Sequence, residues 1–503
     1  MQDVLGHYVY HQSSRVNLAY FSVQQQELSP QCVIQPGSAE QVSQVLSIIK
    51  EQNCIFAIKS GGHGTVAGAS NINGGIVIDL GRLNGIDIAD DESTSLIGTG
   101  SRWKEVYRRL GERGLVTVGG RVSSVGVGGF TLGGGISFIS RRYGWAVDNV
   151  RNYEVVLANG TITNANQKTH PDLYFALRGG GNNFGIVTRF DFETYPLGQM
   201  WAGSNVFFLS DLEERRSALG LQNWFAWDFQ SFAMNGIRLM QRTACLVGFC
   251  VHSTHIIDLL TYLTSEEQTD KSAHAFAYFT WLPDQRGYAA GATIAYSEPK
   301  VNPPVFQHFN SARKIYSTNR LGNISDFVQE IEDQNPVDHR QLWDTATFKV
   351  DAVLISKIWD IFLSEVDPWT HIPGLMMSSN IQLVTKHEIS LFSKNGSNSF
   401  GIDPEDGPLF FFSVTIAYKD ASYDEAMKHV SRNVLSRAIA LGKEMGLHHR
   451  FIYQNYAAHD RDVFSGYGNE NRKRLLQIQQ RYDPDEVFQR LQPGHFKLKA
   501  KGD

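Results

Sequence analysis

The segment Phe56-Ala57-Ile58-Lys59-Ser60-Gly61-Gly62-His63-Gly64-Thr65 joins an apolar strand to a glycine turn and a histidine. Because Gly61 and Gly62 have no Cβ, the backbone N–H groups of this turn can point towards one centre. Converging N–H groups form a nest that suits an anion such as a pyrophosphate. An isolated segment of this kind fits an ordinary surface turn equally well, so its interpretation depends on the rest of the chain.

A second glycine-rich stretch lies between Gly114 and Gly135, and its glycines alternate with valine, leucine and phenylalanine. Flexible linkers with this much glycine are usually polar and rich in serine. The composition instead predicts buried backbone that lies close to a flat or extended group. The run from Gly126 to Thr131 lacks the strand, helix and later acidic residue of a dinucleotide fingerprint, which argues against a nicotinamide-binding Rossmann domain.

A third glycine turn, Leu177-Arg-Gly-Gly-Gly-Asn-Asn-Phe-Gly185, leads into a strand predicted over residues 186–192. Together the three motifs resemble the vanillyl-alcohol-oxidase (PCMH-type) superfamily of FAD-linked oxidases, in its berberine-bridge-enzyme-like branch and fungal form. The resemblance covers the whole chain and includes the C-terminal run Tyr453-Gln-Asn455-Tyr456. It implies an α+β fold: a two-subdomain FAD-binding domain and an antiparallel-sheet substrate domain covered by helices.

The expected domains are an FAD-binding domain over residues 1–197 (core about 27–197), a substrate domain over 198–445, and a segment over 446–503 that returns to the first domain. Apolar periodicity predicts the secondary structure of both domains. Helices are expected at 39–52, 102–113, 172–176, 211–228, 255–264, 323–333, 351–364 and 424–442, and substrate-domain strands at 206–209, 243–252, 274–282, 289–296, 381–385 and 409–418. The sequence predicts that one face of that sheet is rich in aromatic residues. Such a stripe is more often core than pocket, but the resemblance implies that this face covers the active site. The residues expected on this face are Phe276, Tyr278, Phe279, Trp281, Phe410, Phe411 and Phe412.

Charge and composition narrow the choice of partners. The chain has 503 residues and a formal net charge of −5, with no block of basic residues, so neither nucleic acid nor an anionic membrane is expected as a partner. No stretch approaches the ~20 apolar residues that span a bilayer. No signal peptide is expected after Met1, although members of the family commonly carry one. The location therefore stays open between the secretory pathway, with a leader removed, and the cell interior.

Four cysteines give one candidate disulfide. Cys32 and Cys54 flank the first helix, where a bridge would tie neighbouring strands, and the sequence leaves this pairing open. Cys245 and Cys250 fall in a strand-like run and should point to opposite faces of a regular strand. They are therefore expected to be free and buried. A metal site with the nearby histidines is not expected.

The resemblance implies that FAD is bound, and that a single covalent bond joins His63 to the flavin 8α-methyl group. Many relatives form a second bond from a cysteine in a Gly-Arg-Cys run; here the run is Gly120-Arg121-Val122. Val125 corresponds to a position beside the oxygen-reactive carbon of the flavin, where a small residue favours reaction with O2. The predicted cofactor-binding residues are Ser60, Gly61, Gly62, His63, Gly64, Thr65, Gly120, Val122, Val125, Gly126, Gly129, Phe130, Gly185, Ile186, Val187 and Asn455.

The catalytic base is not evident. The strand expected at 409–418 has no acidic residue, although oxidation needs a group that takes a proton while hydride leaves. The C-terminal run makes Tyr453 the first candidate and Tyr456 the second, and Tyr143 is a third. Each is equally compatible with a buried, hydrogen-bonded core tyrosine.

The expected function is an O2-dependent oxidase of a small organic molecule in natural-product biosynthesis. Two alternatives remain. One is a cyclase that shapes its substrate in a flavin pocket without net redox, and the other is a carbohydrate oxidase. Neither the substrate nor the oligomeric state follows from the sequence.

Overall fold

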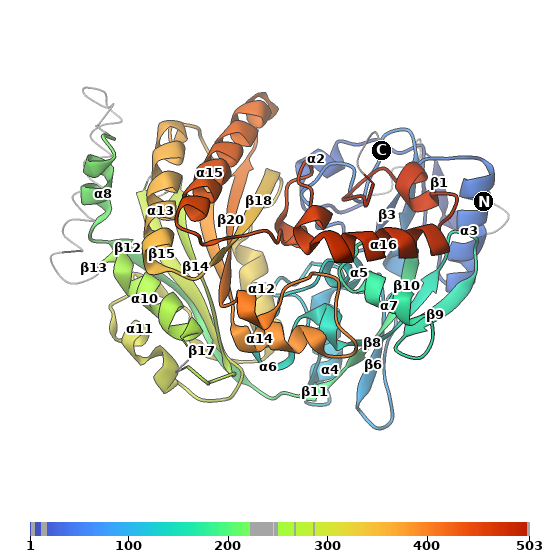
Figure 1. The fold of residues 1–503 in the computed structure, drawn as a ribbon, viewed down its shortest axis with the longest axis horizontal. Helices are drawn as coiled ribbons and strands as arrows, with labels where there is room; N and C mark the ends of the chain where they lie inside the picture. Colours follow the sequence, from blue (N-terminus) through green and yellow to red (C-terminus); the bar gives the residue numbers. More distant parts are fainter. Residues whose placement is uncertain are drawn as a thin grey trace.

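The computed structural model describes residues 1, 6–11, 18–221, 245, 250–265, 268–284 and 287–499. Two lobes are visible (Figure 1): one contains most of the N-terminal half of the chain, and the other contains a large sheet with helices on its outer side. The predicted α+β class is confirmed. No helix in the described ranges is long and apolar enough to cross a membrane. The division of the chain at residues 197 and 445 stays a prediction.

The first lobe contains two small sheets. In one, β2 (Cys32–Ile34), β4 (Ile76–Asp79) and β3 (Phe56–Lys59) run parallel, and β1 (Val9–His11) is added antiparallel to β2. The other is antiparallel, in the order β5 (Ile86–Ile88), β6 (Thr94–Gly98), β10 (Ile186–Glu193), β8 (Val150–Val156) and β9 (Ile162–Asn166). A short pair joins β7 (Leu115–Val116) to β11 (Tyr195–Pro196).

A cap and an apolar stripe are visible in two helices of the first lobe. In α3 (Ala39–Glu51), the side chain of the N-cap residue Ser38 accepts a hydrogen bond from the backbone N–H of Gln41. The apolar face of α4 (Trp103–Gly111) buries Trp103 and Leu110. The remaining helices are α2 (Val23–Gln26), α5 (Val127–Leu132), α6 (Ser140–Tyr143) and α7 (Pro171–Leu177).

The second lobe is built on a ten-stranded sheet. Its main strands, in spatial order, are β13 (Cys250–Val251), β12 (Met200–Leu209), β15 (Gly287–Tyr296), β14 (Ala273–Leu282), β19 (Met376–Val384), β20 (Leu409–Tyr418), β18 (Arg340–Lys349) and β21 (His448–His449). Two short strands, β16 (Tyr316–Ser317) and β17 (Arg320–Gly322), pair with β12. The strand β18 was not expected from the sequence.

Three long helices cover one face of this sheet. The long helices α10 (Ser253–Thr264), α13 (Ala352–Val366) and α15 (Asp424–Glu444) form a hydrophobic core with it and lie on the outer side of the lobe (Figure 1). The shorter helices are α8 (Leu212–Ala218), α11 (Gln307–Ser311), α12 (Ile324–Gln334) and α14 (Lys386–Ser390). The opposite face is turned towards the first lobe, where Arg121 of that lobe contacts Gln382 of β19.

The expectation of a single aromatic face was wrong. Side chains alternate along a strand, so Phe410 and Phe412 pack into the helix-covered core, together with Phe279 and Trp281. Phe411 belongs instead to the core that reaches the first lobe, and in the antiparallel register Gln382 lies opposite both Phe411 and Phe276. Tyr278, two residues from Phe276, lies on the same face. The face towards the first lobe therefore carries fewer aromatic rings and more polar groups than expected.

The cysteine prediction was also wrong. Cys245 and Cys250 form a disulfide, and Cys32 and Cys54 are free. The expectation assumed a regular strand over 243–252, but Cys245 is helical and only Cys250 and Val251 of the described residues form a strand there. The rule that places side chains on opposite faces therefore does not apply to this pair. Residues 243–244 and 246–249, like the end of the helix expected at 211–228, lie outside the described residues.

The C-terminal segment returns to the first lobe. After β21 it forms short turns, the helix α16 (Asn469–Tyr482) and a final helical turn over Val487–Leu491, and α16 lies across the first lobe (Figure 1). Val487, Phe488 and Leu491 are buried against α3 and the parallel strands. Residues from the two ends of the described chain therefore share one hydrophobic core.

Candidate functional site

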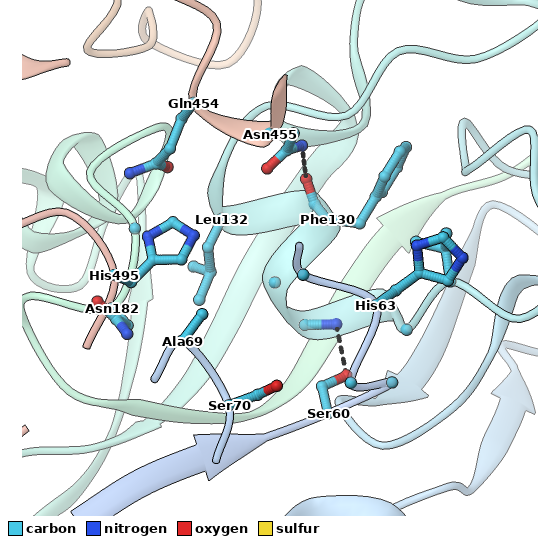
Figure 2. Close-up of a pocket in the computed structure, with 18 of the residues that line it drawn as sticks. Ser60, His63, Ala69, Ser70, Phe130, Leu132, Asn182, Gln454, Asn455 and His495 are labelled. Atoms are coloured by element: carbon cyan, nitrogen blue, oxygen red, sulfur yellow. Dashed lines mark hydrogen bonds between the residues drawn. The ribbon is translucent and has the colours of Figure 1, made fainter. Parts of the chain in front are cut away.

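One cavity lies where the glycine loops, the large sheet and the C-terminal segment meet. All of the predicted cofactor-binding residues line it, together with Tyr453 and Tyr456. Further lining residues are Arg121, Leu132, Asn182, Trp343, Gln454, His495 and Phe496, which the sequence analysis did not single out. Figure 2 shows this cavity, with His63 and Ser60 on one side and Gln454, Asn182 and His495 on the other.

The glycine loops pack against each other with almost no space between their backbones. A Cβ built on Gly61 would lie 2.3 Å from the backbone nitrogen of Gly126, and one built on Gly126 would lie 2.2 Å from that of Gly61. The Ser60 hydroxyl donates to the carbonyl of Thr99 at 2.6 Å and accepts from the N–H of Gly128 at 3.3 Å. These contacts fix two loops that are far apart in the sequence.

The predicted glycines do not all serve the same purpose. Position 62 favours glycine because its φ is +71°, in the left-handed region that other residues rarely adopt. A Cβ on Gly185 would lie 2.5 Å from the side chain of Val155, whereas a Cβ on Gly129 would meet no atom within 4 Å. Since Gly129 lines the cavity, its missing side chain leaves the cavity open rather than making room for another loop.

His63 presents a neutral imidazole to the cavity. Its ring stacks on Phe21, with centroids 4.1 Å apart and an angle of 11° between the planes. The Nε2 atom is buried and has no hydrogen-bond partner among the described residues. Burial lowers the pKa of His63 to about 4. The ring is therefore uncharged at neutral pH, which is the form in which a histidine nitrogen is nucleophilic.

Val122, Val125 and Phe130 form the apolar part of the lining. The Phe130 ring meets Trp103 edge-on, at 5.2 Å between centroids, and its carbonyl accepts a hydrogen bond from the Asn455 amide at 3.0 Å (Figure 2). The contact links the second glycine region to the C-terminal run. The hydrogen bond to Phe130 therefore holds Asn455 in place, and Asn455 also lines the cavity.

The two tyrosines of the C-terminal run have different surroundings. The Tyr453 hydroxyl accepts hydrogen bonds from the Gly135 N–H and from the Asn455 amide, both at 3.1 Å. Its ring stacks on Phe411 at 5.4 Å, and burial raises the pKa of Tyr453 well above its usual range. Tyr456 instead accepts a hydrogen bond from the Arg121 guanidinium at 2.7 Å and packs against Trp343, at 5.3 Å between ring centroids.

Tyr143 is not brought to this cavity. Its ring stacks on Tyr195, with centroids 3.7 Å apart, and it is not among the residues that line the cavity. Of the three tyrosines predicted as bases, only Tyr453 and Tyr456 lie where a ligand of the cavity could meet them.

Arg121 is the main residue of the site that the sequence analysis missed. Its guanidinium donates to the side-chain oxygen of Gln382 and lies 3.3 Å from Nε2 of His274, in addition to its bond with Tyr456. It also lies over the ring of Phe276, 4.7 Å from the centroid. The signal for Arg121 is its place between Gly120 and Val122, two positions predicted to bind the cofactor.

Several polar groups at the other side of the cavity lack partners. Both amide atoms of Gln454 and the Nδ1 atom of His495 are buried without a hydrogen bond among the described residues. His495 adopts a φ of +64°, and burial lowers its pKa to about 4. Buried polar groups are normally hydrogen-bonded, so these atoms indicate that a polar ligand belongs in this part of the cavity. In the described part of the chain, no group of three or more His, Cys, Asp or Glu side chains is arranged to hold a metal ion.

An elongated ligand with both polar and flat apolar parts fits these features. The FAD binding domain family matches residues 30–166, and the family described as berberine and berberine like matches residues 452–493. An FAD-dependent monooxygenase from Cochliobolus heterostrophus is 35% identical over 497 residues, covering 96% of this chain and 88% of the relative. The chain belongs to the berberine-bridge-enzyme-like family of FAD-linked oxidoreductases.

Other members of the family support the same assignment. An FAD-dependent monooxygenase from Fusarium proliferatum is 34% identical and covers 95% of this chain and 87% of its own length. Among solved structures, 6-hydroxy-D-nicotine oxidase from Arthrobacter nicotinovorans superimposes with a TM-score of 0.73 at 17% identity, over 96% of this chain and 94% of that one. A berberine bridge enzyme variant gives a TM-score of 0.68 at 18% identity, over 93% and 92%. The fold and the FAD-dependent oxidoreductase class predicted from the sequence are therefore confirmed.

The residues of the cavity fit FAD. The nucleotide part would lie against the glycine loops around Gly61 and Gly126, and the unpartnered amide of Gln454 and ring of His495 offer polar contacts to it. Uncharged His63 and the apolar residues around Val125 suit the flat ring system. The cofactor-binding residues named from the sequence remain predictions at the level of individual contacts.

Proposed function

We propose that this protein is an FAD-dependent oxidase of a small organic molecule in natural-product biosynthesis, with O2 as the electron acceptor. The observation that carries the proposal is that the glycine loops and neutral His63 line the same cavity as the Tyr456 phenol and the Arg121 guanidinium. FAD in this site would accept a hydride from the substrate and transfer the electrons to O2. The net reaction is then loss of two hydrogens from the substrate and formation of hydrogen peroxide.

Within this reaction, Tyr456 takes the substrate proton. Its oxygen lines the cavity and receives a hydrogen bond from Arg121 at 2.7 Å, and a charged donor stabilises the negative charge that develops on the oxygen it contacts. Tyr453, the first candidate from the sequence, has a hydroxyl that already accepts two hydrogen bonds and a pKa that burial raises. Tyr453 then holds Asn455 and Gly135 in place, and the effect of its removal tests this assignment.

His63 forms the single covalent link to the flavin. The support is its uncharged ring at the cavity wall and the valine at 122, which has no sulfur for a second bond. The link would anchor the flavin ring at the junction of the two lobes. It would also make the cofactor a stronger oxidant.

Anaerobic mixing with candidate substrates tests the redox proposal. Loss of the oxidised flavin absorbance shows hydride transfer, and subsequent exposure to air should restore it with one hydrogen peroxide formed per substrate. Turnover without loss of absorbance and without O2 uptake would instead support a cyclase. The same assay with oligosaccharides tests the carbohydrate alternative.

Monooxygenation is the second candidate, because the two relatives named above are called FAD-dependent monooxygenases. Turnover under 18O2 separates the two reactions. An oxidase leaves the label in hydrogen peroxide, whereas a monooxygenase places one labelled oxygen atom in the product and the other in water.

A further inference from the structure

Arg121 carries a positive charge that the protein itself does not neutralise. It is only partly buried, and it lines the cavity beside Tyr456 and Trp343. In the described part of the chain its guanidinium forms no ion pair with a carboxylate; its partners are the side chains of Gln382, Tyr456 and His274. Charged groups away from bulk water are normally paired, so this environment lacks an anion.

The neighbouring groups do not supply that anion. Burial lowers the pKa of His274 well below its usual range, so the ring is uncharged. The carboxyl of Glu388 interacts electrostatically with Arg121, but it is fully buried, accepts a hydrogen bond from the Trp145 indole at 2.8 Å and does not line the cavity. The charge of Glu388 is opposed by a second buried guanidinium, that of Arg141. Asp270 also acts on Arg141, and neither Glu388 nor Asp270 forms an ion pair with Arg121 among the described residues.

Arg121 also has hydrogen-bond donors to spare. A guanidinium has five N–H donors, and the contacts in the described residues use one terminal nitrogen twice and the other once. Nε–H and one terminal N–H therefore have no partner there. Spare N–H donors of a guanidinium can bind the oxygens of a carboxylate or the oxygen of an ionised phenol.

The surroundings of these donors are aromatic. The rings of Tyr456 and Trp343 line the cavity 5.3 Å apart, and the Phe276 ring lies beneath the guanidinium. Flat, apolar walls next to a cationic group favour a ligand that combines an aromatic ring with a negative charge. We infer that the substrate of this protein is an aromatic molecule with an anionic oxygen, a carboxylate or an ionised phenol, and that Arg121 binds that oxygen. The inference rests on the proposed function, because it takes the ligand beside Arg121 to be the substrate.

Equilibrium binding to the FAD-loaded protein tests the inference without turnover. Three acids (benzoate, salicylate and 2-naphthoate) are compared with their uncharged amides, and 4-cyanophenol above its own pKa is compared with benzonitrile, all by calorimetry. At least one anion should bind ten or more times tighter than its neutral partner. A preference among the acids alone would assign a carboxylate, and a preference for the phenolate alone would assign a phenol.

Variants locate the binding group. Arg121→Gln should reduce the affinity for the preferred anion at least tenfold and leave the affinity for its neutral partner within about twofold, while Arg121→Lys should retain part of the preference. Arg142→Gln is the matched control, because Arg142 is similarly buried but does not line the cavity. Equal binding of every anion and its neutral partner by the wild-type protein would overturn the inference, and so would an unchanged preference in Arg121→Gln. The wild-type comparison decides the matter even if Arg121→Gln does not fold.

The outcome is independent of whether the protein is an oxidase. Failure to bleach the flavin with any substrate would remove the proposed oxidation but leave an anion preference standing. Oxidation of a neutral substrate, with no anion preference, would remove the inference about Arg121 and leave the proposed function intact.

Discussion

The two ends of the cavity are built in different ways. The end formed by the glycine loops is made of backbone: Gly61 and Gly126 meet with less than the space of one Cβ between them. The end that faces the large sheet is made of side chains, among them Arg121, Tyr456 and Trp343. Contacts through backbone leave a pattern of residue types in the sequence, whereas contacts through side chains depend on which distant segments meet. Each variant below changes one end of the cavity, and the measurement shows whether the other end is affected.

The largest expected effect is at His63. His63→Ala should abolish covalent attachment, so that acid-denatured protein releases all of its FAD, while the native protein still binds FAD because the glycine loops are unchanged. In-gel flavin fluorescence and peptide mapping of the wild type provide the comparison, with a single flavinylated peptide containing His63. Flavin released from denatured wild-type protein would show that no covalent bond exists, and a flavinylated cysteine peptide would show a second link.

Gly61→Val and Gly129→Val separate two uses of glycine at the backbone end. At Gly61 the new side chain overlaps the backbone of Gly126, so we expect loss of folding stability beyond the ~1–3 kcal/mol typical of overpacking. At Gly129 the new Cβ meets no protein atom within 4 Å and the position lines the cavity, so the melting temperature should hold while the FAD content falls.

Gly111→Val is the matched control for Gly129→Val, because its Cβ also meets nothing within 4 Å and Gly111 also lies in a helix, far from the cavity lining. Thermal melting and the ratio of flavin to protein absorbance measure both effects. Full FAD loading of Gly129→Val would show that the cofactor does not need the space beside Gly129.

At the side-chain end, Tyr456→Phe removes one hydroxyl and keeps the ring. The rate of anaerobic flavin reduction should fall on the order of 10²-fold, as expected for loss of a general base. Tyr453→Phe should reduce this rate much less and should mainly weaken the position of Asn455. Stopped-flow absorbance measures both rates, and a larger loss in Tyr453→Phe would return the role to Tyr453.

The smallest effect is expected at Val125, which lines the cavity between the two ends. Val125→Leu adds one methylene to the apolar wall, so access of O2 should narrow and reoxidation of the reduced flavin should slow several-fold. The midpoint potential should stay the same, because no charge or hydrogen bond changes. If the reoxidation rate is equal to that of the wild type, Val125 does not control O2 access.

Regular elements of the fold could be predicted because their signals are local. Apolar periodicity places α3, the apolar run before the first glycine turn places β3, and the apolar run after the third glycine turn places β10. β18 was missed because it mixes Arg340, Asp344 and Lys349 with apolar residues, and its pairing with β20 decides its conformation. The aromatic face was misassigned because alternation within Phe410-Phe411-Phe412 was not applied residue by residue.

The site, like the fold, has residues that local sequence motifs predict and others that only the folded structure brings together. The residues named from the glycine motifs all line the cavity. Arg121, His274 and Gln382 could not be grouped from the sequence, because they come from a loop and two separate strands that meet only after the lobes pack. The roles of Tyr453 and Tyr456 depend on which hydroxyl the Arg121 side chain reaches, and three residues of spacing do not determine that.

The return of the C-terminal segment affects the order of events during synthesis. Gln454, Asn455, His495 and Phe496 complete the wall of a cavity whose other walls are formed by residues before position 190 and by Trp343. The cavity can therefore close only after residues 454–496 have been synthesised. A chain cut short after α15 would lack this wall, and the glycine loops would stay open on that side.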